Sequence, residues 1–156
     1  MSKPEFVYTT YIETSAEKLW LALTDGDFTE RYWLGHRVSS DWEAGSPYIF
    51  TRHGAITIEG NVLVSEPYTR LVYTWIPLSP ETKHERISRV TFDLEPRGKV
   101  IKLIVTHDHL DEGGKTRRDI SAGWPMVLAN LKSFLETGHA LEIDPPAAAT
   151  RETACA

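Results

Sequence analysis

The sequence contains a single cysteine, Cys155, among its 156 residues. One cysteine excludes an intramolecular disulfide framework, and it also excludes a zinc site built from several thiolates. The chain has no run of about 18 apolar residues, so no segment is expected to span a membrane. Its first residues, MSKPEFVYTT, lack the apolar region of a signal peptide. We therefore expect a cytoplasmic protein without membrane contact.

Positive charge is also scarce. Seventeen lysines and arginines stand against 22 aspartates and glutamates, which gives a formal net charge of −5. Nucleic-acid-binding domains usually carry a basic face, so we expect no nucleic-acid partner. The length predicts one domain, which we assign to residues 1–143. Residues 144–156 have too little apolar content to pack and are predicted to be a disordered tail.

The longest helical pattern runs from Trp124 to Gly138. Its apolar residues recur at helical spacing and form one stripe, whereas Asn130 falls on the polar side. Pro125 suits the first turn of a helix, where its missing N–H is tolerated, and Gly138 suits a left-handed C-terminal cap. A helix with one apolar face must pack against another element, and the strands that precede it are the available partner.

Alternating apolar residues predict seven strands before this helix. The first covers residues 6–12, and the others cover 37–42, 48–53, 56–64, 71–75, 88–94 and 101–107. Two short helices follow the first strand, one opened by a capping box of Thr14 and Glu17 and one opened by Asp27. Gly60 is a candidate bulge. The short connections predict an antiparallel sheet and an α+β fold.

This order of elements resembles the START-like or SRPBCC superfamily, which has the helix-grip fold, and in particular its branch named after the activator of the Hsp-90 ATPase. The similarity extends from Val7 to Gly138. Its motifs are Tyr11-Ile12-Glu13, Ala16 to Asp25, Tyr32-Trp33, Asp41-Trp42, Gly45-Ser46, Glu66-Pro67, Leu71 to Trp75, Val105-Thr106-His107, Gly123-Trp124-Pro125, Leu131-Lys132 and Leu135 to Gly138. The resemblance implies a curved seven-stranded antiparallel sheet around the C-terminal helix, with a cavity that opens near the two short helices.

Alternation along the strands predicts which side chains face the helix. With those of the helices, they form a candidate ligand pocket of Trp33, Tyr48, Phe50, Ile58, Tyr73, Trp75, Val90, Phe92, Leu103, Val105, His107, Trp124, Leu128 and Leu131. Ile56 is expected to face the same way. Ligand pockets are mostly apolar with a few polar groups, so a small apolar or amphipathic molecule is the expected partner. A filled core would give the same pattern, and this alternative stays open.

His107 is the one polar member of that set and the one candidate for catalysis. A histidine there could orient a ligand or move a proton, or it could be satisfied by a neighbouring group. His109 lies on the same strand face, but no further ligand is placed near it by sequence spacing, so we predict no metal site. Asp41, Arg52 and Glu59 are other polar candidates near the sheet. The sequence points to no cofactor.

Three functions follow from these observations. The first is binding of a small hydrophobic molecule, and the second is an enzyme of the cyclase, lyase or hydrolase type that uses His107 and a carboxylate. The third, implied by the resemblance alone, is stimulation of a chaperone ATPase through a chaperone partner. A homodimer through a sheet face or strand edge is compatible with each of them. We favour the binding protein over the enzyme.

Overall fold

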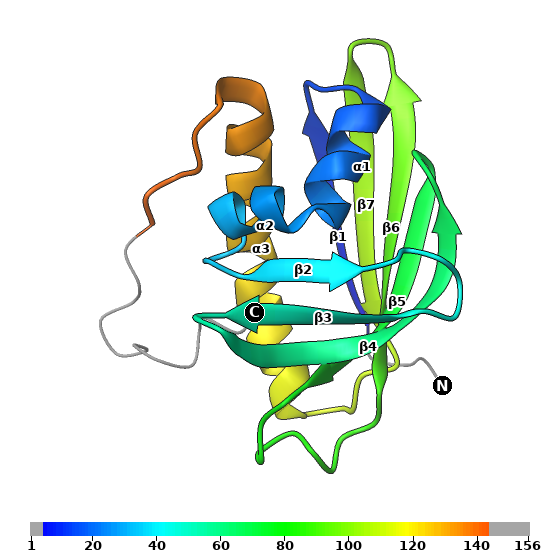
Figure 1. Cartoon of the computed structure of the whole chain (residues 1–156), viewed down its shortest axis with the longest axis vertical. Coiled ribbons are helices and arrows are strands. Elements are labelled where there is room, and N and C mark those ends of the chain that lie inside the picture. Colours follow the sequence, from blue (N-terminus) through cyan, green and yellow to red (C-terminus); the bar gives the residue numbers. More distant parts are fainter. Residues whose placement is uncertain (1–4, 144–156) are drawn as a thin grey trace.

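The computed structural model describes residues 5–143 and shows a curved antiparallel sheet against one long helix (Figure 1). The seven strands lie in the order β1-β7-β6-β5-β4-β3-β2. The elements are β1 (Phe6–Ile12), α1 (Ala16–Thr24), α2 (Gly26–Tyr32), β2 (Arg37–Ser40), β3 (Pro47–Arg52), β4 (Ala55–Glu66), β5 (Arg70–Pro77), β6 (Ser88–Arg97), β7 (Val100–Asp108) and α3 (Lys115–Thr137). The predicted helix-grip fold is confirmed. The predicted tail, residues 144–156, lies outside the described residues.

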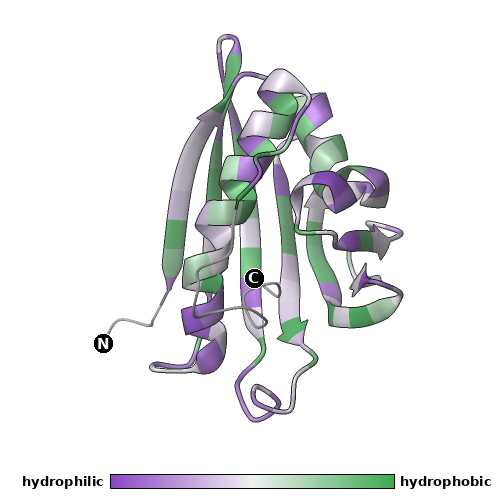
Figure 2. Ribbon diagram, turned by 90° about the vertical axis from the view of Figure 1, so that its left-hand side faces the viewer, coloured by the Kyte–Doolittle hydropathy of each residue, from purple (hydrophilic) through white to green (hydrophobic). Residues whose placement is uncertain are grey.

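The core lies between the concave face of the sheet and α3. Side chains of β6 and β7 alternate between buried and partly exposed along most of each strand, as the sequence predicts. Figure 2 shows α3 running along the sheet, with hydrophobic segments on both elements. Burial of these two apolar faces against each other is the main stabilising contribution that this architecture offers. None of the helices within residues 5–143 is long and apolar enough to cross a membrane.

Helix α3 is longer than predicted, because it begins at Lys115 rather than at Trp124. Pro125 therefore lies inside the helix, and the prediction that it occupies the first turn is wrong. The predicted C-terminal cap is confirmed, since Gly138 has a φ of 87°. Asn130, predicted on the polar side, is buried, and its Oδ1 accepts a hydrogen bond of 2.9 Å from the backbone N–H of Leu141.

The two short helices are present, but their N-caps differ from the prediction by one and two positions. Ser15, not Thr14, caps α1 and accepts a hydrogen bond of 3.1 Å from the N–H of Lys18. Asp25, not Asp27, caps α2 and accepts a hydrogen bond of 2.8 Å. Hydroxyl and carboxylate groups are both good N-cap acceptors. Each helix start has two such residues close together, and the local sequence pattern does not show which of the two is the cap.

Register shifts explain two further errors in the strands. Ile56 is exposed instead of facing the helix, because the pairing of β3 with β4 shifts between Phe50 and Thr51. The irregularity in the pairing of β4 with β5 lies between Val62 and Val64 rather than at Gly60. Gly60 instead allows close packing, since a Cβ there would lie 2.7 Å from Cε2 of Tyr48.

Candidate functional site

All fourteen predicted pocket residues face the interior, and each is at most 2% exposed. Their aromatic rings contact one another. The ring centroids of Trp33 and Trp124 are 5.4 Å apart, and those of Trp75 and Trp124 are 5.7 Å apart. Tyr48 and Tyr73 approach to 4.3 Å. These rings occupy the space between sheet and helix, and a ligand there requires them to move. The role of these residues in ligand binding stays a prediction.

His107 lies in the middle of this aromatic interior and is fully buried. The indole Nε1 of Trp124 donates a hydrogen bond of 3.1 Å to Nδ1 of His107. Because an indole N–H can only donate, Nδ1 must be an acceptor, and the ring proton is on Nε2. Nε2–H then donates to Oγ of Ser88 over 2.8 Å. Burial lowers the pKa of His107 to about 3, so the ring is neutral at physiological pH.

This tautomer bears directly on the enzyme hypothesis. A histidine that activates a serine must present a free lone pair to the hydroxyl, whereas Nε2 of His107 presents a proton to Ser88. The neighbouring carboxylate of Asp108 is bound instead by Arg89, at 2.8 Å and 3.0 Å. The arrangement seen here therefore fixes the ring of His107 and holds β6, β7 and α3 together.

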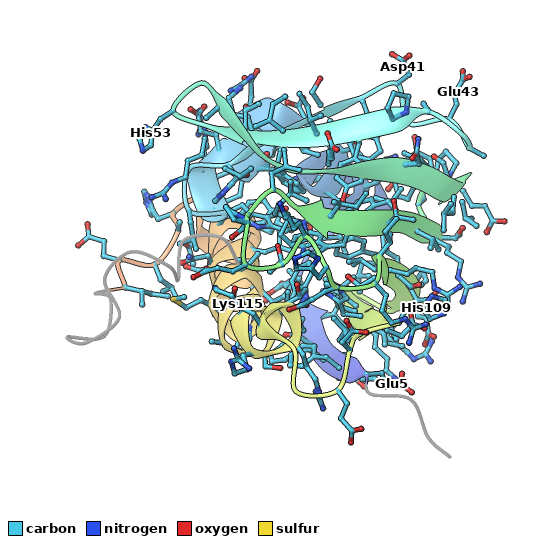
Figure 3. The ribbon with its side chains drawn as sticks, turned by 90° about the horizontal axis from the view of Figure 1, so that it is seen from below. Glu5, Asp41, Glu43, His53, His109 and Lys115 are labelled. Carbon is cyan, nitrogen blue, oxygen red and sulfur yellow. The ribbon has the colours of Figure 1, made fainter. Side chains whose placement is uncertain are left out.

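The other polar candidates do not converge on His107. Asp41 and Glu59 are exposed, and Nε of Arg52 is buried without a hydrogen-bond partner. Figure 3 shows His53 and His109 on different sides of the molecule. Within residues 5–143, no cluster of three or more His, Cys, Asp or Glu side chains is arranged to hold a metal ion.

The β5–β6 loop (residues 78–87) and the first turn of α3 lie at the end of the sheet away from α1 (Figure 1). An open pocket is lined there by this loop, by the end of β5 and by Thr116 of α3. Its volume is about 300 Å³. The resemblance implies an opening near α1 and α2 instead. The pocket is lined by Trp75, Ile76, Pro77, Leu78, Ser79, Thr82, Lys83, Glu85, Arg86, Ile87 and Thr116. Of these residues, the sequence predicts only Trp75 as part of a site.

Trp75 connects this pocket to the interior. It is only 1% exposed, yet it lines the pocket on one side and contacts the rings of Trp124 and His107 on the other. At the rim, Leu78 and Ile87 are 46% and 56% exposed. A second pocket of about 170 Å³ shares Leu78 and includes the exposed Ile56. Exposed apolar side chains, which are unfavourable in contact with water, therefore cluster around this opening.

Glu85 joins the β5–β6 loop to the first turn of α3. Its carboxylate accepts hydrogen bonds from the backbone N–H groups of Lys115 and Thr116, at 2.8 Å and 3.2 Å. The N–H of Arg86 donates in turn to Oδ2 of Asp111 over 3.2 Å. Sequence reasoning missed Glu85, because its contacts join segments about thirty residues apart in the chain and follow no local motif.

The sequence profile of the activator of Hsp90 ATPase homolog 1-like proteins matches residues 13–136. The chain belongs to this family. The matched residues extend from α1 through nearly all of α3, and they include Trp75, His107 and the residues that line the pocket. None of the curated proteins matches the sequence.

Solved structures share the fold of this activator of Hsp90 ATPase homolog 1-like chain. Protein MLL2253 from Mesorhizobium loti is 25% identical over 85% of this chain and 96% of its own, with a TM-score of 0.74. The Aha1 dimer from Colwellia psychrerythraea is 23% identical over 86% and 98%, with a TM-score of 0.72. PFC0360w, an HSP90 activator from Plasmodium falciparum, is 21% identical over 84% and 95%, with a TM-score of 0.71.

Proposed function

We propose that this protein binds a small, mostly apolar molecule in the pocket between the β5–β6 loop and α3. The observation that carries the proposal is the position of Trp75. This buried ring forms the apolar base of an open pocket whose rim carries the exposed side chains of Leu78 and Ile87. Polar and charged residues also line the pocket, namely Ser79, Thr82, Lys83, Glu85, Arg86 and Thr116, and such groups can orient a ligand against an aromatic base.

The size of the pocket sets the size of the ligand. A volume of about 300 Å³ is at the lower end of the range for small-molecule sites. Each square ångström of apolar surface removed from water contributes about 25 cal/mol, so a compact aromatic or branched molecule gains most from this site. A larger ligand reaches Trp124 and His107 only if the ring of Trp75 turns aside.

Native mass spectrometry on protein purified gently from its own host tests the proposal. We expect a discrete added mass that disappears on denaturation, and its value gives the chemical class of the ligand. The extracted molecule, added back to stripped protein, should shift the amide resonances of residues 75–88 and 115–120. The proposal would be contradicted by protein that is recovered without any added mass and whose amide resonances do not shift when 1-anilinonaphthalene-8-sulfonate is added.

A second candidate is stimulation of a chaperone ATPase, which the family match over residues 13–136 favours. PFC0360w from Plasmodium falciparum, a protein of the same fold, is described as an HSP90 activator. The test is the ATPase rate of the host's Hsp90 with and without this protein. Saturable stimulation supports a co-chaperone, and a rate unchanged at high protein concentration removes this candidate.

A homodimer and a cytoplasmic location remain proposals. The dimer is suggested by the Colwellia psychrerythraea protein of the same fold and by the position of β1 at one edge of the sheet. Val7 and Tyr11 of β1 are exposed there. Light scattering after size-exclusion chromatography gives the mass directly, and a monomer at all accessible concentrations would refute the dimer.

A further inference from the structure

The β5–β6 loop is held against the start of α3 mainly by the carboxylate of Glu85, which accepts two backbone hydrogen bonds, and Glu81 adds an ion pair of 3.8 Å with Lys115. We infer that this loop is the gate of the proposed ligand site and that Glu85 holds the gate closed. The inference rests on the proposed function, and it adds a mechanism for entry and release. Its structural basis is that Glu85 and Thr116, which are joined by a hydrogen bond, both line the same pocket.

Glu85 provides the N-terminal cap that residues next to α3 do not provide. The N-cap residue of α3, Gly114, has no side chain, and it makes no side-chain capping bond. The first N–H groups of a helix have no partner within the helix, and a carboxylate at that end also interacts favourably with the helix dipole. Glu85 satisfies two of these N–H groups from a distant loop. The start of α3 and the closed position of the loop therefore depend on the same contact.

Packing around Gly114 shows how closely the loop approaches. A Cβ at Gly114 would lie 3.0 Å from Oε1 and 3.2 Å from Cδ of Glu85. A larger residue at this position would require the carboxylate of Glu85 to move by a few tenths of an ångström. The closed position of the gate is thus specified by the helix side as well as by the loop.

Both ends of the loop are fixed, which confines its motion to the middle. At one end the N–H of Leu78 donates to the carbonyl of Thr57 over 2.9 Å. At the other end Ser88 begins β6 and is bonded to His107. Between these ends, contacts to α3 and its preceding loop are made by the carboxylate of Glu85, by the N–H of Arg86, and by Glu81, whose carboxylate lies 3.8 Å from Nζ of Lys115. Release of Glu85 lets the loop swing from α3.

Opening of the gate has a defined consequence for the interior. Thr116 of the first helical turn is buried and lines the pocket together with Trp75. When the loop leaves α3, the pocket widens and the ring of Trp75 gains solvent contact. Ligand entry then becomes limited by the fraction of time that Glu85 is detached, as for a lid that closes a binding site.

The test compares Glu85→Gln and Glu85→Ala with Glu112→Ala. Glu112 is an exposed glutamate in the loop before α3, outside the contacts of Glu85, and serves as the matched control. Loss of charge-assisted hydrogen bonds should raise the open population, and with it the association rate of 1-anilinonaphthalene-8-sulfonate, by roughly tenfold in Glu85→Ala. Glu85→Gln should be intermediate, and Glu112→Ala should match the wild type in stopped-flow measurements.

Two further readouts separate failure of the gate from failure of the proposed function. Amide exchange at Lys115 and Thr116 should accelerate in both Glu85 variants, and ¹⁹F spectra with 5-fluorotryptophan should show a more solvent-exposed Trp75. If amide exchange accelerates but Trp75 exposure and association rates do not change, Glu85 is only a helix cap and the gate is refuted. If Trp75 becomes exposed but neither wild type nor variant binds the probe, the loop opens as inferred and the ligand site is what fails.

Discussion

The indole N–H of Trp124 donates to Nδ1 of His107, and this 3.1 Å contact fixes the proton of the imidazole on Nε2. It joins the long helix to β7, and the bond from Nε2 to Ser88 extends the chain to β6. His107 is thereby fully hydrogen-bonded as a neutral ring in an apolar interior. The same bonds that satisfy it leave no lone pair directed at Ser88.

Replacement of Trp124 by phenylalanine should leave Nδ1 of His107 buried without a donor. An unsatisfied buried polar group costs about 1–3 kcal/mol, and the smaller ring adds the loss of packed volume. Urea denaturation should therefore show a clearly lower free energy of unfolding. Trp20→Phe is the control, because Trp20 is only partly buried on α1. Equal losses in the two variants would contradict the role assigned to the hydrogen bond.

His107 should also make stability depend on pH. Its pKa is about 3 in the folded protein because of burial, whereas an unfolded histidine titrates near about 6.5. Between these values the unfolded chain binds the extra proton, so the free energy of unfolding falls as pH drops from about 6.5 toward 3, by at most about 1.4 kcal/mol per pH unit. Above that window His107 contributes no pH dependence.

Urea unfolding of the wild type and of His107→Gln at several pH values between 7.5 and 4.5 measures this contribution. The variant should lose much of the slope, although His36 adds a slope of the same sign because burial also lowers its pKa. His139→Gln serves as the control, since His139 is exposed. A slope that persists unchanged in His107→Gln would show that other groups produce it.

Gly60→Ala should destabilise the sheet. The new methyl group would lie 2.7 Å from Tyr48 and still closer to the carbonyl oxygen of Thr74. Because these neighbours are a buried ring and backbone, relief requires a strand to shift, at a cost of about 1–3 kcal/mol or more. Thermal or urea unfolding measures it, and the exposed neighbour Asn61→Ala should stay within about 0.5 kcal/mol of wild type. A stable Gly60→Ala would mean that β4 and β5 are less closely paired here.

The positions of the strands along the chain and their inward-facing residues were predictable because period-two alternation records burial directly. Val90, Phe92, Leu103 and Val105 needed no tertiary information, since each alternates with a polar neighbour. Ile56 shows the limit of the method. It follows the alternation, but the register shift opposite Phe50 turns it outward, and such a shift depends on the partner strand.

The start of α3 and the open pocket could not be predicted for a related reason. Residues 115–123 carry few large apolar side chains, and their cap is Glu85, which comes from a loop far away in sequence. Pro125 is a residue typical of a helix start, whereas the actual N-cap, Gly114, has no side chain that indicates one. The pocket forms where this unrecognised first turn meets an irregular loop, and neither has a periodic pattern that a sequence argument can use.

The most direct test of the ligand site compares Leu78→Ser with Leu63→Ser. Both leucines are similarly exposed, at 46% and 45%, but only Leu78 lines the pocket between the β5–β6 loop and α3. The measurement is the affinity for 1-anilinonaphthalene-8-sulfonate by fluorescence titration. We predict that Leu78→Ser weakens binding by about tenfold, as expected for about 1.4 kcal/mol of lost apolar contact, and that Leu63→Ser binds like the wild type. Equal affinities in the two variants would contradict the assignment of the ligand to this pocket.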